Sequence, residues 1–279
     1  MTLNFTKMHG IGNDYIYFNC FETEIQNPED LAIKLSDRHF GVGGDGIVLI
    51  LPSEVADAKM RMFNIDGSEG KMCGNAIRCV AKFVYDNKIV NKEQLTIETL
   101  SGIKILDLKI SNGLVESVKV NMGPAELTPK NIPVDIPGDT VVAYPITVDE
   151  KEYKITCVSM GNPHAVIFYE GIDSLNLPEI GPLFENYELF PDRINTEFVE
   201  VLGRNSLNMR VWERGSGETL ACGTGACAVA VASVLNGFCD KDTDINVKLI
   251  GGDLTINYTD DAVFMTGGCT KVFDGTVEI

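Results

Sequence analysis

The stretch Glu69-Gly70-Lys71-Met72-Cys73-Gly74-Asn75-Ala76 decides the fold, because the chain contains a related stretch a second time. Residues 60–74 align with residues 209–223 without a gap, and both segments begin with Met-Arg and end with Cys-Gly. Glu69 is equivalent to Glu218 and Cys73 to Cys222, at one constant offset of 149 residues (218 − 69 and 222 − 73). A duplicated unit that keeps one thiol in each copy suggests that two thiols act on one substrate.

Both copies have the same local pattern. Residues 59–63 and 208–212 alternate between polar and apolar side chains, which predicts a strand. A loop containing Gly and Ser follows, and an apolar, alanine-rich segment with helical spacing then begins at the cysteine. We therefore expect each cysteine at a helix N-terminus, where unpaired N–H groups and the macrodipole favour negative charge. Such a position can lower the pKa of a thiol from about 8.5 to between roughly 3.5 and 7.5.

Two facing thiols would solve one chemical problem. Inverting a carbon that bears a hydrogen requires a base on one face and an acid on the other, because a single group returns the proton to its original side. A thiolate and a thiol can exchange these roles between the two reaction directions. If the substrate has a carboxylate at that carbon, the helix N-termini would stabilise the charge that develops in the transition state. The pattern indicates a racemase or epimerase of amino acids.

Four motifs follow in a fixed order along the chain: Asn64-Ile65-Asp66-Gly67-Ser68-Glu69, Met72-Cys73-Gly74-Asn75, Gly161-Asn162-Pro163-His164 and Glu213-Arg214-Gly215-Ser216-Gly217-Glu218-Thr219-Leu220-Ala221-Cys222-Gly223-Thr224-Gly225. Together they resemble the diaminopimelate epimerase family, cofactor-independent enzymes that convert L,L-diaminopimelate to the meso form. The resemblance extends from residues 5–14 to the last expected strand. It implies an isomerase of amino-acid biosynthesis whose product serves lysine synthesis, cell-wall synthesis or both.

The resemblance also implies an α+β fold with two pseudo-symmetric domains, each a curved, mostly antiparallel sheet or barrel around a central helix, with the active site between them. From the residues, Gly123-Pro124 interrupts an antiparallel pattern and places the domain boundary near Met122. We expect an N-terminal domain, 1–122, that carries Cys73 and is completed by a C-terminal strand, 267–279. The C-terminal domain, 123–266, carries Cys222.

Residue by residue, the resemblance assigns roles in the site. Cys73 and Cys222 would be the catalytic acid and base. The substrate-binding residues would be Asn13, Asn64, Gly74, Asn75, Asn162, Asn195, Glu213, Arg214, Gly223 and Thr224. Three further residues would support the site from behind: His164, Glu69 and Glu218.

Two of these assignments also have a basis in side-chain chemistry. The adjacent Glu213 and Arg214 could bind a zwitterion, with the guanidinium on the carboxylate and the glutamate on the ammonium group.

Residues 41–46 fit G-x-G-x-x-G, but here a helical segment comes before and a strand follows, which argues against a dinucleotide site. Many family members have glutamine where this chain has Gly46, so one substrate contact is absent or is made by water or backbone.

Composition excludes several other classes of protein. The formal charge of −17 argues against nucleic-acid binding, and no apolar run approaches the ~20 residues of a membrane span. The first residues lack the features of a signal peptide, so we expect a cytoplasmic protein. The eight cysteines contain no Cys-x-x-Cys pair and there are only three histidines, which argues against a metal site. We expect no cofactor, a small-molecule substrate and, by resemblance, a homodimer.

Two alternatives stay open at this point. A racemase of the same fold could act on another amino acid, such as histidine or proline; proline-racemase relatives typically have histidine where this chain has Asn75. A thiol redox or sensor protein could form a disulfide between Cys73 and Cys222. Because two activated thiols that meet over a small substrate oxidise readily when it is absent, we expect inactivation by oxidants and recovery with reductant.

Overall fold

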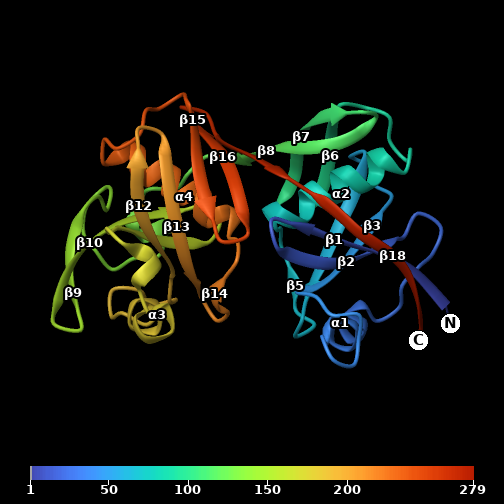
Figure 1. Cartoon of the computed structure of the whole chain (residues 1–279), viewed down its shortest axis with the longest axis horizontal. Helices are drawn as coiled ribbons and strands as arrows, with labels where there is room; N and C mark the ends of the chain where they lie inside the picture. Colours follow the sequence, from blue (N-terminus) through green and yellow to red (C-terminus); the bar gives the residue numbers. More distant parts are fainter. Residues whose placement is uncertain (1) are drawn as a thin grey trace. The chain divides into compact units, whose positions relative to one another are not determined.

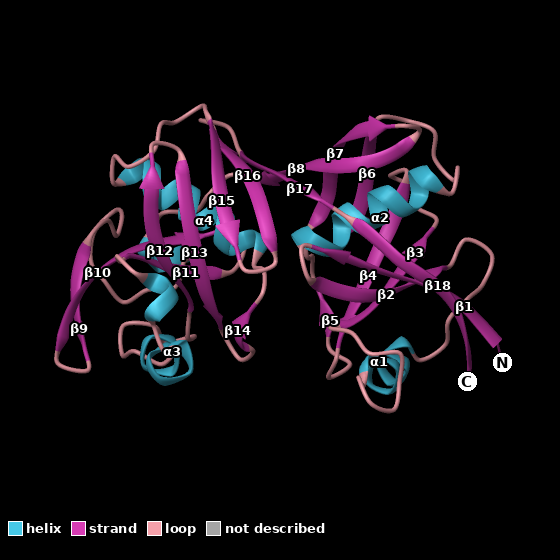
Figure 2. Cartoon of the chain, in the orientation of Figure 1, coloured by secondary structure: helices cyan, strands magenta, loops and turns pink. Residues whose placement is uncertain are grey.

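The computed structural model describes residues 2–279. Within this range the chain forms eighteen β-strands, four α-helices and two short 3₁₀ helices, a sheet-dominated α+β fold as predicted (Figure 2). It divides into two compact units: residues up to Asn121 together with Thr266–Ile279, and Met122–Met265. In the described range, no helix has both the length and the apolar character that crossing a membrane requires.

The first unit is built from the N-terminal part of the chain together with its last strand (Figure 1). The strands pair in the order β18-β1-β2-β3-β4-β6-β7-β8, with β5 also on β4, and all pairs are antiparallel except β2–β3 and β4–β6. Its helices are α1 (Pro28–Ser36) and α2 (Gly74–Asp86). The strands are β1 (Thr2–Gly10), β2 (Asn13–Asn19), β3 (Gly46–Leu51), β4 (Ala58–Asn64), β5 (Glu69–Gly70), β6 (Gln94–Thr99), β7 (Gly102–Ser111), β8 (Leu114–Gly123) and β18 (Thr270–Glu278).

The second unit repeats this plan within one continuous segment. Its strands pair in the order β9-β10-β11-β12-β13-β15-β16, with β14 also on β13, and the parallel pairs β11–β12 and β13–β15 are equivalent to those of the first unit. The strands are β9 (Tyr144–Val148), β10 (Lys151–Ser159), β11 (Pro163–Phe168), β12 (Asn195–Gly203), β13 (Ser206–Glu213), β14 (Gly217–Thr219), β15 (Asp244–Leu249), β16 (Gly252–Tyr258) and β17 (Val263–Gly268). The helices are η1 (Pro129–Asn131), η2 (Ile172–Ser174), α3 (Leu177–Glu185) and α4 (Gly223–Leu235).

The duplication predicted from the sequence is visible in α2 and α4. Both helices have 13 residues, ten of them buried, and each begins at the glycine that follows a repeated cysteine. The prediction of a helix start at each cysteine is thus confirmed. Helix α2 packs against β1, β2, β4, β6 and β7, and α4 against β10, β11, β12, β15 and β16. Because strands surround each helix, its small and apolar residues are buried on nearly every side.

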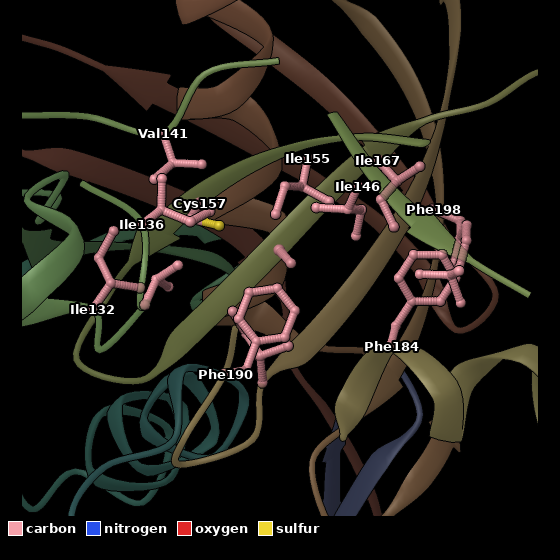
Figure 3. Close-up of a cluster of buried hydrophobic side chains, with 14 of the residues drawn as sticks. Ile132, Ile136, Val141, Ile146, Ile155, Cys157, Ile167, Phe184, Phe190 and Phe198 are labelled. Carbon is pink, nitrogen blue, oxygen red and sulfur yellow. The ribbon is translucent and has the colours of Figure 1, made fainter. Parts of the chain in front are cut away.

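A cluster of apolar side chains joins α3 to the sheet of the second unit (Figure 3). The ring of Phe184 on α3 meets that of Phe198 on β12 edge-on, with centroids 5.3 Å apart. Gly181 allows the helix to lie close to β13, because a Cβ at this position would be 2.3 Å from Cδ2 of Trp212. This contact fixes the strand that ends at Glu213.

The last strand, β18, pairs antiparallel with the first strand, β1. Leu3 lies opposite Val277 and His9 opposite Thr270. The pairing gives β1 two neighbours, β2 and β18, as β10 has β11 and β9 in the second unit.

Candidate active site

In the first unit, Cys73 is the N-cap residue of α2. Its carbonyl oxygen accepts the first helical hydrogen bond, from the N–H of Ile77 at 3.0 Å, so its side chain stands where the unpaired N–H groups of the helix begin. The thiol is half-buried, and Sγ lies 3.4 Å from Oδ1 of Asn13. A carbonyl oxygen can only accept, so this contact is a hydrogen bond from the protonated thiol.

Asp45 fixes the orientation of the Asn13 amide. Its Oδ2 accepts from Nδ2 of Asn13 at 2.7 Å and from the N–H of Asp14 at 3.1 Å, while its Oδ1 accepts from Nη2 of Arg38 at 3.0 Å. With Nδ2 held by the carboxylate, Oδ1 of Asn13 is directed at the sulfur of Cys73. Sequence reasoning did not single out Asp45, although it lies inside the glycine-rich segment that was considered for nucleotide binding and rejected.

Gly46 occupies a position that no other residue can take without a shift. Its φ is +153°, and a Cβ there would lie 2.0 Å from the carbonyl oxygen of Phe63 and 2.8 Å from Cε1 of Tyr15. A glutamine, which the resemblance would place here, therefore has no room on this backbone. Gly46 pairs with Asn64 across the β3–β4 ladder.

The other first-unit residues expected in the site lie near the same loop. Gly74 and Asn75 form the first turn of α2, with Asn75 buried. Asn64 is half-buried and donates from Nδ2 to Oγ of Ser68 at 3.0 Å, within its own turn.

In the second unit, Cys222 is the N-cap residue of α4. Its carbonyl oxygen accepts from the N–H of Ala226 at 2.9 Å. Its Sγ accepts from the N–H of Gly225 at 3.4 Å and lies 3.5 Å from Oγ1 of Thr224. This sulfur is buried, whereas that of Cys73 is half-buried.

Burial and two nearby carboxylates nevertheless make Cys222 a weak acid. Burial raises the pKa of its thiol well above the ordinary value, the charges of Glu213 and Glu197 raise it further, and the hydrogen bonds with Thr224 and Gly225 oppose this only in part. The pKa of Glu213 is itself raised by burial, against the hydrogen bonds that it forms with Thr219 and Cys222. The expectation that the helix N-terminus lowers the thiol pKa is therefore wrong for Cys222, because desolvation and two nearby carboxylates outweigh the helix.

Glu213 thus lies at the thiol, a position that the sequence did not indicate. Its Oε1 accepts from Oγ1 of Thr219 at 2.5 Å. The neighbouring Arg214 donates from Nη1 to the carbonyl oxygen of Asp192 at 2.8 Å. Its backbone N–H donates to Oδ1 of Asn195 at 2.9 Å, and Nδ2 of Asn195 donates to the carbonyl oxygen of Pro163 at 2.7 Å. Asn195 therefore ties the loop after β13 to the start of β11.

His164 is completely buried between two oxygen-bearing side chains. Its Nδ1 is 2.6 Å from Oε1 of Glu197, and its Nε2 is 3.1 Å from Oδ1 of Asn162. Glu197 is also fully buried and was missed by the sequence analysis. Polar residues surround it in the sequence, Asn195-Thr196 before it and Glu200 three residues after it, so nothing local distinguished this glutamate from an exposed one.

Glu69 and Glu218 form equivalent ion pairs in the two copies, each with an arginine of the preceding strand. Glu69 accepts from Nε of Arg61 at 2.7 Å, and Glu218 accepts from Nε of Arg210 at 2.8 Å. Each ion pair joins the strand before the cysteine loop to the short strand inside it. The repeated Met-Arg and the repeated glutamate are thus two halves of one interaction that holds the loop.

Comparison with known proteins places this chain. The family model for diaminopimelate epimerase matches residues 5–128 and 156–272. The chain belongs to the diaminopimelate epimerase family. It is 58% identical over 279 residues to a diaminopimelate epimerase of Acetivibrio thermocellus and 56% identical to one of Methanococcus maripaludis, with 99% or more of each chain covered. Family membership makes it an isomerase, an epimerase as the motifs indicated.

Solved structures of other proteins share the fold. A Bacillus anthracis protein of the PhzF family matches with a TM-score of 0.71 at 17% identity over 100% of both chains. A hydroxyproline epimerase of Agrobacterium vitis matches with a TM-score of 0.69 at 14% identity, over 99% of this chain and 91% of that one. Within residues 2–279, no three or more His, Cys, Asp or Glu side chains are grouped so that they could hold a metal ion.

Proposed function

We propose that the chain converts L,L-diaminopimelate to meso-diaminopimelate by a two-base mechanism in which Cys73 and Cys222 act on opposite faces of the α-carbon. The observation that carries the proposal is the placement of each cysteine at the N-cap of an equivalent buried helix in an equivalent unit. We propose that each unit is a domain, with the boundary near Met122, and that the two domains close around the substrate. The proposed setting is cytoplasmic lysine biosynthesis, with a homodimer as the working form.

The surroundings of both thiols favour the protonated form. Cys73 donates to Asn13, whereas Cys222 accepts from the N–H of Gly225 and lies beside carboxylates that favour its protonated form. One thiol must first release its proton to solvent; as the thiolate it then removes the α-proton while the other thiol supplies a proton to the opposite face, so that this exchange gains or loses no net proton. Glu213 contacts Cys222, and the pKa values of both groups are raised. Glu213 is therefore suited to keeping the Cys222 thiol protonated until that thiol donates its proton to the substrate.

Backbone N–H groups at the starts of the two helices would bind the carboxylate of the reacting centre. Those of Gly74 and Asn75 lie in the first turn of α2, and those of Gly223 and Thr224 in the first turn of α4. Donors at these positions stabilise charge that moves from the α-carbon onto the carboxylate in the transition state. Asn64, Asn162, Asn195, Glu213 and Arg214 remain the proposed contacts for the rest of the substrate.

The test is incubation of reduced protein with L,L-diaminopimelate in heavy water, with meso product and α-deuterium measured together. Meso product that carries solvent deuterium at the inverted carbon is expected from the unaltered protein. Cys73→Ala and Cys222→Ala should each lose it, while Cys20→Ala, a buried cysteine outside the repeat, should retain it. Folded, reduced protein that gives neither exchange nor product would exclude this substrate, and a panel of amino acids including histidine would follow.

A further inference from the structure

In the proposed mechanism Glu197 acts only through its charge on Cys222, yet this residue is among the most buried charged groups of the second unit. Glu197 on β12 and His164 on β11 are both completely shielded from solvent and lie on neighbouring parallel strands. Their side chains meet at 2.6 Å between Oε1 and Nδ1. Burial of a carboxylate is costly unless it is paired, so the pair needs an explanation beyond packing.

The hydrogen bonds around His164 define its protonation. Nδ1 faces a carboxylate oxygen and Nε2 faces the amide oxygen of Asn162. An ionised carboxylate and an amide carbonyl can only accept hydrogen bonds. The ring satisfies both oxygens only when both nitrogens carry a proton, that is, as an imidazolium ion.

Glu197 approaches the N-terminus of α4 through Oε1, while its second oxygen, Oε2, is buried and has no hydrogen-bond partner among the described residues. Gly225 lies in the first turn of α4, and a Cβ at that position would be 2.7 Å from Oε1 of Glu197. The missing side chain thus lets the carboxylate approach the helix N-terminus, whose partial positive charge stabilises an anion. The other titratable groups that face Glu197 are Cys157, Glu213 and Cys222. Among these neighbours His164 is the one side chain that can carry a positive charge.

We propose that Glu197 is a positioning residue: it keeps His164 protonated on both nitrogens, and the ring in turn holds the amide of Asn162 in one orientation. With Oδ1 of Asn162 occupied by Nε2–H, its NH₂ group is turned away from the ring, and within residues 2–279 it has no acceptor. The half-buried amide can then donate to a carboxylate of the substrate. The kinetic part of this inference rests on the proposed function, whereas the protonation of His164 does not.

The protonation can be measured directly, because the chain has only three histidines. We would label histidine with ¹⁵N and record ring nitrogen spectra at pH 7.5, assigning signals with His9→Gln and His39→Gln. His9 is an internal control: its Nδ1 accepts from the N–H of Gly12 at 3.2 Å and so cannot carry a proton there. Both nitrogens of His164 should have imidazolium shifts.

Either neutral form of His164 overturns the proposal. A proton on Nδ1 alone would mean that the Asn162 amide is flipped and donates to the ring. A proton on Nε2 alone would mean that Glu197 is itself protonated and donates. These outcomes hold whether or not the protein acts on diaminopimelate.

The variant Glu197→Gln tests the role of the carboxylate. It should abolish the imidazolium signals at pH 7.5 and lower kcat/KM by about 10- to 100-fold, mainly through KM, as expected when a hydrogen bond to a charged group is lost. Glu200→Gln, on the same strand with its carboxylate bonded to the N–H of Gly171 at 2.9 Å, should change neither. Glu197→Asp keeps the charge and should restore the imidazolium signals at least in part, which also covers a Gln variant that folds poorly.

The two readouts separate the possible failures. Imidazolium signals that persist in Glu197→Gln would refute the role of Glu197. Loss of these signals with KM unchanged would refute the link to Asn162. Imidazolium signals in a protein without activity on diaminopimelate would leave the positioning of His164 standing and remove the proposed substrate.

Discussion

Gly46→Ala should be one of the most damaging single-methyl changes in the first unit. The added Cβ would lie 2.0 Å from the carbonyl oxygen of Phe63, a backbone atom that cannot move without disturbing the β3–β4 ladder. The residue would also have to adopt φ = +153°. Left-handed strain costs about 1–2 kcal/mol and overpacking a further 1–3 kcal/mol, which together lower the free energy of unfolding by about 2–5 kcal/mol.

For a chain of this size each kcal/mol changes Tm by roughly 2–4 °C, so we expect a decrease of about 4–20 °C in thermal unfolding followed by circular dichroism. Gly102→Ala is the matched control in the same unit. Its φ is +89°, and a Cβ there has no atom within 4 Å among the described residues, so it carries the backbone strain without the collision. Equal decreases in Tm for the two variants would refute the steric argument.

Three further predictions concern the thiols. Burial raises the folded-state pKa to about 11 for Cys20 and Cys269 and to about 12 for Cys79. Because these thiols lose their protons at lower pH in the unfolded chain, the free energy of unfolding should be unaffected below about pH 9 and should decrease from there to pH 12. A constant free energy of unfolding in urea titrations at pH 8–11 would contradict this. Glu213→Gln removes a charge that raises the pKa of Cys222, so peptide mapping should find alkylation of this thiol at pH 8 accelerated by roughly threefold to tenfold, with an unchanged rate counting against the assigned cause. Mild oxidant should abolish epimerase activity and reductant restore it; activity indifferent to both would argue against two catalytic thiols.

The duplicated stretch was enough to predict the helices α2 and α4 and the residues at which they start. A small-residue, apolar segment that follows Cys-Gly at the same offset in each copy has one favourable arrangement, a buried helix with its N-terminus at the cysteine. The repeat could also have predicted the ion pairs Arg61–Glu69 and Arg210–Glu218, because the arginine and the glutamate recur at the same spacing in both copies. That signal was present in the sequence and was interpreted only for the glutamates.

Contacts set by pairing between distant strands could not be predicted. Glu197 meets His164 because β11 and β12 lie parallel, and no local spacing encodes their sequence separation of 33. The restriction at Gly46 likewise arises from Phe63 on the opposing strand. The raised pKa of Cys222 depends first on burial and then on carboxylates supplied by two other strands, so the helix N-terminus, which the sequence does reveal, gave the wrong direction.

The pairing of β18 with β1 sets the order in which the chain can be completed during synthesis. The segment Met122–Met265 contains all of its own unit and can close as soon as it leaves the ribosome. The first unit emerges earlier but must wait, with the outer edge of β1 unpaired, until Thr270–Glu278 has been made. An open edge is a template for wrong pairing, so the half of the protein that is translated first is the half most exposed to aggregation before release.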